Sequence, residues 1–194
     1  MSNHLLTIVA LVSCTALSGQ NTAALPPAFE TLPGNAGVAM PLRWSKGKLQ
    51  VFIDPPMMPS NFVGETITGL RLRRTAFEGS GAYPAMTRTM QIHGGFQPFP
   101  AVQMIGSASQ NLTIVPRLLL FGPAVVNVAA TPAPGGPTMT VGDDLVQITF
   151  SQPLPVTAGT LFSESATHAG PPTIAPGTWA DAVPVAAGTA DGHV

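Results

Sequence analysis

The sequence predicts an all-β protein, specifically an antiparallel β-sandwich of the jelly-roll type with extended N- and C-terminal segments. Charged residues make up only 9% of the 194 residues, whereas about a quarter is typical of soluble domains. The chain also carries 20 Gly and 21 Pro, which divide it into short runs of good strand propensity. No run keeps the 3.6-residue period of an amphipathic helix. Short strands between Pro and Gly turns are typical of sandwiches and jelly rolls.

The N-terminal segment, residues 1–24, is predicted to be either an export signal or, if it is retained, an apolar strand. The apolar run at 5–12 is too short to cross a bilayer, and small residues suited to cleavage follow it. The same run is rich in β-branched residues, which favour strands. A retained strand would complete its own sheet or add to the edge of a neighbouring molecule. Its donor residues would be Leu5, Leu6, Ile8, Val9, Leu11 and Val12.

Residues 25–163 are predicted to form the sandwich domain. The clearest strand is 65–74, where period-two alternation directs leucines to a core and arginines to an outer surface. The leucines are Leu70 and Leu72, and the arginines are Arg71 and Arg73. Pro and Gly are expected to end strands, because proline cannot donate to a ladder. The other strands are expected at 48–54, 86–93, 112–115, 118–121, 124–128, 145–150 and 160–162.

The strand expected at 86–93 contains the one histidine that lies inside the predicted domain. Met86, Arg88, Met90 and Ile92 share one of its faces. Two glycines follow the strand and are expected to end it. His93 is therefore predicted to be a surface residue at a strand end rather than a catalytic or ligating group.

Residues 164–194 are predicted to be an extension, because they are rich in Pro, Ala, Gly and Thr with almost no charge. Apolar residues near its end offer a second candidate donor for strand addition, made of Trp179, Val183 and Val185. Glycan attachment is expected at Asn111, which opens an Asn-Leu-Thr sequon, and at Thr173 and Thr178 in a stalk-like composition.

Composition and motifs argue against catalysis, cofactors and metals. A net charge of −1 gives no attraction for nucleic acid, and no transmembrane segment is predicted. The chain has no nucleophile elbow, and Cys14 is the only cysteine, with no histidine pair at zinc-ligand spacing. Asp143-Asp144 could contribute to a calcium site, but a solvated turn is favoured.

The arginines of the expected strands leave two interpretations open. One is an exposed sheet face whose charges are balanced by Glu65 or Glu78, and this interpretation is favoured. The other is a basic patch that binds anions or glycans. The residues concerned are Arg71, Arg73, Arg74 and Arg88.

Three stretches of the chain, in order, carry a family resemblance. They are Pro33-Gly34-Asn35 with the strand at 48–54, the run 67–74, and Ile148-Thr149-Phe150 with Pro153-Leu154 and Gly159-Thr160-Leu161. Together they resemble a group of secreted β-sandwich proteins of unknown function common in planctomycete-type bacteria. The resemblance covers about residues 26–163 and implies export and a sandwich fold. It supplies no catalytic residues.

Two functions from different classes follow from these observations. The first is a non-catalytic structural subunit of an extracellular filament or surface assembly, which joins other copies of itself head to tail by terminal-strand addition. The second is a secreted module that binds carbohydrate or envelope components through an arginine-lined face. Low surface charge favours self-association and therefore the first hypothesis. Both place the protein outside the cell or at its surface.

Overall fold

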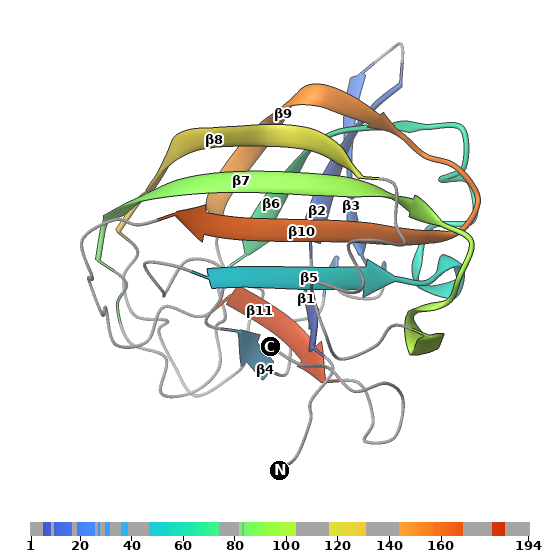
Figure 1. The fold of residues 1–194 in the computed structure, drawn as a ribbon, viewed down its shortest axis with the longest axis horizontal. Coiled ribbons are helices and arrows are strands. Elements are labelled where there is room, and N and C mark those ends of the chain that lie inside the picture. The colour runs from blue at the N-terminus through green and yellow to red at the C-terminus, as the bar shows by residue number, and fades with distance from the viewer. Residues whose placement is uncertain are drawn as a thin grey trace.

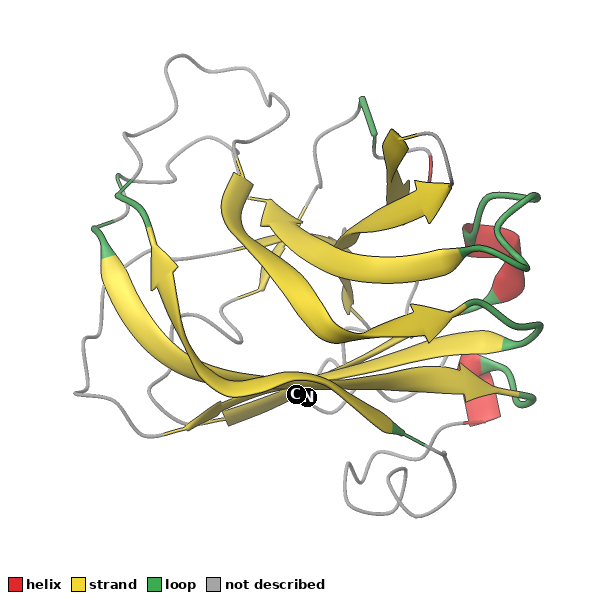
Figure 2. Cartoon of the chain, turned by 90° about the horizontal axis from the view of Figure 1, so that it is seen from above, coloured by secondary structure: helices red, strands yellow, loops and turns green. Residues whose placement is uncertain are grey.

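In the residues that it describes, the computed structural model consists mostly of antiparallel strands (Figure 1), which confirms the predicted all-β class. Two four-stranded sheets lie on opposite sides of a shared core, and a three-stranded sheet lies beside them (Figures 1 and 2). The finer assignment as a jelly-roll sandwich stays a prediction. The structure describes residues 6–8, 10–16, 19–25, 27, 30–31, 36–38, 47–73, 82, 84–103, 117–130, 144–168 and 180–184.

The front sheet has the strand order β5-β10-β7-β8, and every neighbouring pair is antiparallel. Alternate residues of β5 enter the core, so Lys48, Gln50 and Phe52 lie on the opposite, outer face of this sheet. The strands are β5 (Gly47–Ile53), β10 (Thr160–His168), β7 (Met86–Gln97) and β8 (Leu118–Val128). β10 therefore continues beyond residue 163, where the predicted domain ends.

The back sheet has the order β3-β2-β6-β9 and is also antiparallel. Its strands are β3 (Gly19–Leu25), β2 (Ala10–Ala16), β6 (Thr66–Arg73) and β9 (Asp144–Pro155). The N-terminal strand β2 pairs with the central strand β6, with Val12 opposite Leu70. Half of the back sheet is therefore formed by residues 10–25.

The third sheet joins the two ends of the chain. It consists of β1 (Leu6–Ile8), β11 (Ala180–Pro184) and β4 (Ala36–Val38), in the order β1-β11-β4. Leu6 is the Cα partner of Pro184, and Ile8 that of Ala182. Figure 1 shows this sheet beyond β5, and β1 approaches β5 without pairing with it.

The core lies between the two large sheets and takes apolar side chains from both. Leu70 and Leu72 are 7% and 4% exposed, which confirms their predicted core positions. A cavity of about 50 Å³ remains between the sheets and is lined mainly by apolar side chains of β5, β6 and β10. The remaining core positions are held by Leu25, Leu49, Val51, Ile53, Phe62, Ile67, Met86, Met90, Ile92, Leu120, Val126, Val128, Val146, Ile148, Leu154, Val156 and Leu161.

The prediction of an exposed arginine face is wrong for two of its members. Arg73 and Arg88 are only 3% and 2% exposed. Arg88 shares the inner face of β7 with Met86, Met90 and Ile92, and its Nη1 donates to the carbonyl oxygen of Thr87 at 3.0 Å. The alternation of residues along this strand correctly predicts that Arg88 shares a face with Met86, Met90 and Ile92. It does not show that this face is the buried one.

Pro and Gly end some strands where they were expected to and not others. β5 ends at Ile53, before Pro55-Pro56, whereas β7, β8 and β9 continue through expected breakers. β7 runs through Gly94, where a Cβ would lie 2.7 Å from Cδ1 of Leu120, so a larger residue would require that side chain to shift. β8 joins two predicted strands across Gly122-Pro123, and β9 continues past Pro153. β8 and β9 are each the last strand of a sheet, a position where proline costs no ladder hydrogen bond.

The two sides of the molecule differ in how the sheet edges are treated. On one side β8 and β9 run next to each other (Figure 1), and Ser151 Oγ donates to the carbonyl oxygen of Leu120 at 2.9 Å. The other two edge strands, β5 in the front sheet and β3 in the back sheet, contain no proline. We call the β5 edge of the front sheet, next to which the third sheet lies, the open side.

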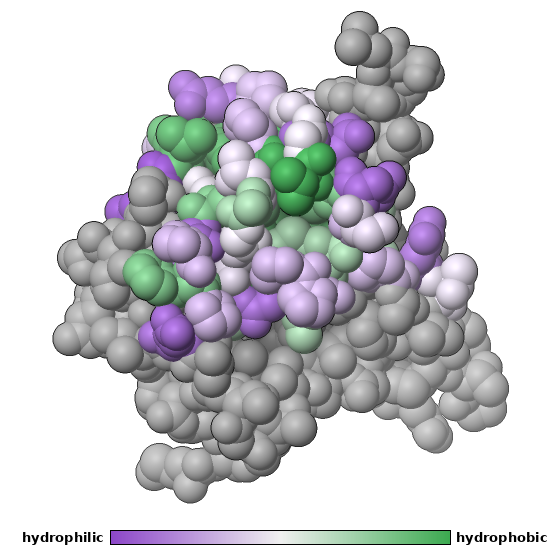
Figure 3. Space-filling model, turned by 90° about the vertical axis from the view of Figure 1, so that its right-hand side faces the viewer, coloured by the Kyte–Doolittle hydropathy of each residue, from purple (hydrophilic) through white to green (hydrophobic). Residues whose placement is uncertain are grey.

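The loops at one end of the large sheets form a fixed, weakly charged surface. Asp54 Oδ1 accepts hydrogen bonds from the Ala101 backbone N–H at 2.8 Å and from Thr160 Oγ1 at 2.7 Å. This ties the short helices η2 (Pro55–Met57) and η3 (Ala101–Gln103) to β10. Figure 3 shows apolar groups among polar ones at this end, where Val63 and Phe99 are exposed. No helix in the described ranges has the length and apolarity needed to cross a membrane.

Candidate functional site

A row of four residues crosses the outer face of the front sheet, one residue from each strand. Glu164 on β10 is the Cα partner of Gln50 on β5 and of His93 on β7. His93 is in turn the Cα partner of Leu119 on β8. We call Gln50, Glu164, His93 and Leu119 the central row. Paired residues of neighbouring strands share a face, so these side chains lie side by side.

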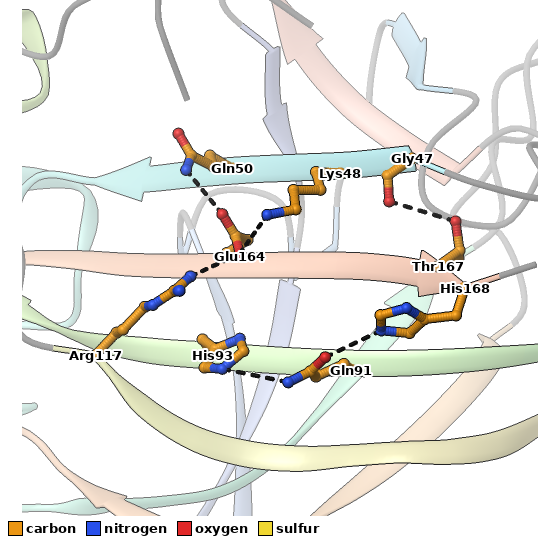
Figure 4. A network of polar contacts seen from close by, with 9 residues as sticks. All are labelled: Gly47, Lys48, Gln50, Gln91, His93, Arg117, Glu164, Thr167 and His168. Atoms are coloured by element: carbon orange, nitrogen blue, oxygen red, sulfur yellow. Dashed lines mark hydrogen bonds and ion pairs between the residues drawn. The ribbon is translucent and has the colours of Figure 1, made fainter. Parts of the chain in front are cut away.

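Glu164 is the electrostatic centre of this row, and it is only 1% exposed. Its Oε1 accepts a hydrogen bond from Arg117 Nη1 at 2.9 Å, and its Oε2 accepts one from Gln50 Nε2 at 2.9 Å (Figure 4). Lys48 Nζ lies 3.8 Å from Oε1. A buried carboxylate is stable only when it is paired and hydrogen-bonded, and these three partners meet that requirement.

Lys48 and Arg117, which we call the cation pair, reach Glu164 from opposite sides. Lys48 comes from the start of β5, and Arg117 precedes β8, the strand at the other edge of the sheet. Their side chains are 54% and 33% exposed, whereas that of Glu164 is 2% exposed. The carboxylate therefore anchors two cations that remain open to solvent.

His93 is held as a neutral imidazole beside this charged group. Burial lowers its pKa below the usual 6.5, and the neighbouring Arg117 and Lys48 lower it further, while Glu164 acts in the opposite direction. The Nδ1 atom of His93 is buried and has no hydrogen-bond partner. A charged imidazole here would add a third cation to Arg117 and Lys48.

A glutamine links the two histidines of the sheet. Oε1 of Gln91 lies 3.0 Å from Nε2 of His168, and Nε2 of Gln91 lies 3.4 Å from Nε2 of His93 (Figure 4). Because an amide oxygen only accepts and an amide nitrogen only donates, His168 donates to Gln91 and Gln91 donates to His93. This arrangement leaves the proton of His93 on Nδ1.

The rows on either side of the central row differ in character. Phe52 and Phe162 are Cα partners with ring centroids 5.2 Å apart, and Gly95 completes their row on β7. The opposite row combines Lys48 with Ala166 and Gln91. Small Ala166 leaves the long side chains of its neighbours free to extend across the sheet.

The central row and the cation pair can bind charge. Both oxygens of Glu164 are occupied by donors, so this carboxylate is poorly placed to take a proton from a substrate. Within the described ranges no three His, Cys, Asp or Glu side chains are close enough to hold a metal ion. Arg117 and Lys48 keep donors that Glu164 does not use.

The predicted assembly residues lie mostly in strands that pair within the chain. Leu6 and Ile8 are in β1, Leu11 and Val12 are in β2, and Val183 is in β11. Both candidate donors are brought together, because β1 pairs with β11. Leu5, Val9, Trp179 and Val185, together with Asn111, Thr173, Thr178 and Asp143, lie outside the described residues.

Sequence reasoning missed most of the polar cluster. His93 was predicted at a strand end, yet it stands within β7 because that strand continues to Gln97. Glu164 was assigned to the C-terminal extension, and Arg117 lies just after a proline between two expected strands. One signal was available: an acidic residue in a run of strand-forming residues is rare in a chain with so few charges.

Comparison with known proteins gives no further identification: no family model matches this chain, and no curated protein or solved structure is similar to it. The functional argument therefore rests on the sheets and side chains themselves.

Proposed function

We propose that this protein is a non-catalytic structural subunit of an extracellular filament or surface assembly, in which copies exchange terminal strands. The observation that carries the proposal is the pairing of both chain ends at the open side. β2 is a partner of the central strand β6, and β1 is a partner of β11. The same pairs can form between two copies, since backbone ladders do not depend on which chain supplies the strand.

The energetics of exchange favour association at high local concentration. A closed subunit and an exchanged one contain the same ladder bonds and bury the same side chains, so they differ mainly in chain connectivity. Pairing within one chain has an effective concentration of about millimolar, which favours the closed form in dilute solution. A crowded cell surface shifts the balance toward exchange.

The sheet edges support an assembly that grows from one side. β8 and β9 carry Pro123 and Pro153, which hinder the addition of a further strand. β5, the edge strand at the open side, lacks proline, and so does β3, the other edge strand of the back sheet. A terminal strand passed to the next copy leaves the acceptor's own terminal strand free, so the contact is head to tail and does not close.

A pair of cysteines across β1 and β11 tests the exchange for either donor. Thr7 and Val183 are Cα partners, and the variant Thr7→Cys/Val183→Cys is made with Cys14→Ser so that no other thiol is present. After concentration and mild oxidation, exchange gives a ladder of covalent oligomers on a non-reducing gel. Closed subunits give only an internally linked monomer.

The matched controls are the two single-cysteine variants in the same Cys14→Ser background. Each can form at most a dimer, so a ladder that continues beyond dimers requires both cysteines. Electron microscopy of the concentrated, unmodified protein then shows whether the oligomers are filaments. Internally linked monomers at the highest attainable concentration would contradict the proposal.

A further inference from the structure

We propose that the outer face of the front sheet binds acidic polysaccharide, with Arg117 and Lys48 holding a carboxylate group of a uronic acid. This site is separate from the terminal strands and does not depend on strand exchange. The observations that carry the proposal are the surplus of cations at the central row, the exposure of the cation pair, and the neutral polar and apolar groups beside it.

The first step is the charge balance around Glu164. Lys48 and Arg117 both contact its Oε1, and His93 is neutral beside them, so the group keeps one positive charge. Asp54, which follows β5, accepts hydrogen bonds from Ala101 and Thr160. One further anion would neutralise the cluster.

The second step is the supply of hydrogen-bond donors. Arg117 has five N–H donors and gives one, on Nη1, to Glu164. Lys48 Nζ lies 3.8 Å from the carboxylate, which is beyond hydrogen-bond distance. Its N–H donors are therefore not used in hydrogen bonds to Glu164. Because both cations lie against the same oxygen atom, a single external carboxylate can contact both of them.

The third step is access. The side chains of Lys48 and Arg117 are 54% and 33% exposed, so a ligand reaches their donors without opening the sheet. Glu164 lies beneath them and fixes their positions. Guanidinium binds carboxylate through two parallel hydrogen bonds, which makes Arg117 the more selective of the two cations.

The fourth step is the kind of molecule that carries the carboxylate. Gln91 and His168 extend the polar face along the strands and match hydroxyl groups, which both donate and accept hydrogen bonds. Leu119, which is 40% exposed and belongs to the central row, offers an apolar surface for the C–H face of a sugar ring. An acidic sugar presents all three kinds of group.

Calorimetric titration of the full chain with a short polygalacturonate oligomer tests the proposal. The expected result is binding that weakens when NaCl is raised from about 50 mM to about 500 mM, because the pair is exposed and screened by salt. Arg117→Gln is expected to reduce affinity about tenfold, and Lys48→Gln less, as expected for losing a charged hydrogen bond. Arg117→Lys keeps the charge but loses the planar fork, so its affinity should fall between those of wild type and Arg117→Gln.

The controls separate this site from general stickiness and from misfolding. Thr87→Ala alters an exposed position of β7, the strand that carries His93. Thr87 Oγ1 donates to Oδ1 of Asn127 at 3.0 Å, and the variant is expected to leave the affinity for the oligomer unchanged. Thermal unfolding confirms that each variant folds. The proposal is overturned by absence of binding at low salt, by equal affinity for a neutral maltooligosaccharide or for polyglutamate, or by unchanged affinity in Arg117→Gln.

Discussion

At the scale of single residues, the main feature of the front sheet is a buried acid, Glu164, in a protein with few charges. Glu164 is almost fully buried, and its partners come from strands on both sides of it. Burying an ion is unfavourable unless every lone pair is used. The cluster therefore fixes the relative positions of β5, β10 and the start of β8, whatever ligand it binds.

Replacing Glu164 by Gln should destabilise the protein by about 1–3 kcal/mol, because Arg117 loses its charged acceptor while the shape of the side chain is kept. Equilibrium unfolding in urea measures the change. The matched variant Lys48→Gln removes the half-exposed cation at 3.8 Å and should alter stability by less than about 0.5 kcal/mol. Equal losses in both variants would contradict this account.

His93 gives stability a defined pH dependence. Its pKa is lowered in the folded protein, so the unfolded chain binds a proton more readily in the interval just below 6.5. The stabilising contribution is complete above pH 6.5 and is lost as the pH falls through the lowered, folded-state pKa. His93→Gln should show a shallower loss of stability between neutral and mildly acid pH than wild type, as measured by unfolding at a series of pH values. Parallel curves for the two proteins would show that His93 does not carry this dependence.

At the scale of elements, the sequence predicted the strands whose alternation is regular and whose ends are marked. Expected strands at 48–54 and 65–74 correspond to β5 (Gly47–Ile53) and β6 (Thr66–Arg73). β7, β8 and β9 were cut short because Gly and Pro were treated as breakers. Whether proline interrupts a strand depends on its place in the sheet, and this is a tertiary property that a linear pattern does not contain.

The candidate site was less predictable than the fold for a related physical reason. Alternation separates two faces of a strand but does not say which face is buried, so Arg88 and Arg71 were treated alike. The central row depends on register across four strands, with residues from positions 50, 93, 119 and 164. Such register is set by long-range pairing and is not visible in local composition.

A substitution at Gly94 tests whether the lack of a side chain there is needed for β7 to continue past its predicted end. Gly94→Ala places a Cβ 2.7 Å from Cδ1 of Leu120 and 3.2 Å from the carbonyl oxygen of Phe162. Overpacking of this kind should reduce stability by about 1–3 kcal/mol. Adding Leu120→Ala removes the closest contact, so in a double-mutant cycle the two changes should be less than additive by at least about 0.5 kcal/mol. Strict additivity would mean that Gly94 is needed for another reason.

At the scale of the whole molecule, the edge where β8 and β9 run next to each other differs from the open side, and we propose different roles for the two. The edges at β8 and β9 are protected by prolines and by their proximity to each other, and the chain ends lie at the open side. The polar cluster occupies the outer face of the front sheet between these sides. The surfaces proposed for assembly and for ligand binding are therefore separate, and the two proposed functions should respond to different conditions.

The proposed strand exchange and the proposed polyuronate binding should differ in their response to salt. Strand exchange uses backbone hydrogen bonds and apolar contacts in a chain of net charge −1, so the oligomer distribution should be similar in about 50 mM and about 500 mM NaCl. Light scattering after size-exclusion chromatography measures this distribution. Polyuronate binding by the same samples should weaken when the NaCl concentration is raised over this range. An assembly that dissolves at high salt would indicate that contacts between charges, rather than exchanged strands, join the subunits.

The pairing of β1 with β11 also has a consequence for the order in which the chain folds. Leu6 meets Pro184 across this ladder, so the contact spans nearly the whole sequence and cannot form until synthesis has reached the final strand. Contacts of such high sequence separation slow folding, because loop closure must precede any gain from pairing. Among the described strands β1 therefore has no ladder partner until β11 has been synthesised, whereas β2 and β3 can pair with each other and with β6 earlier.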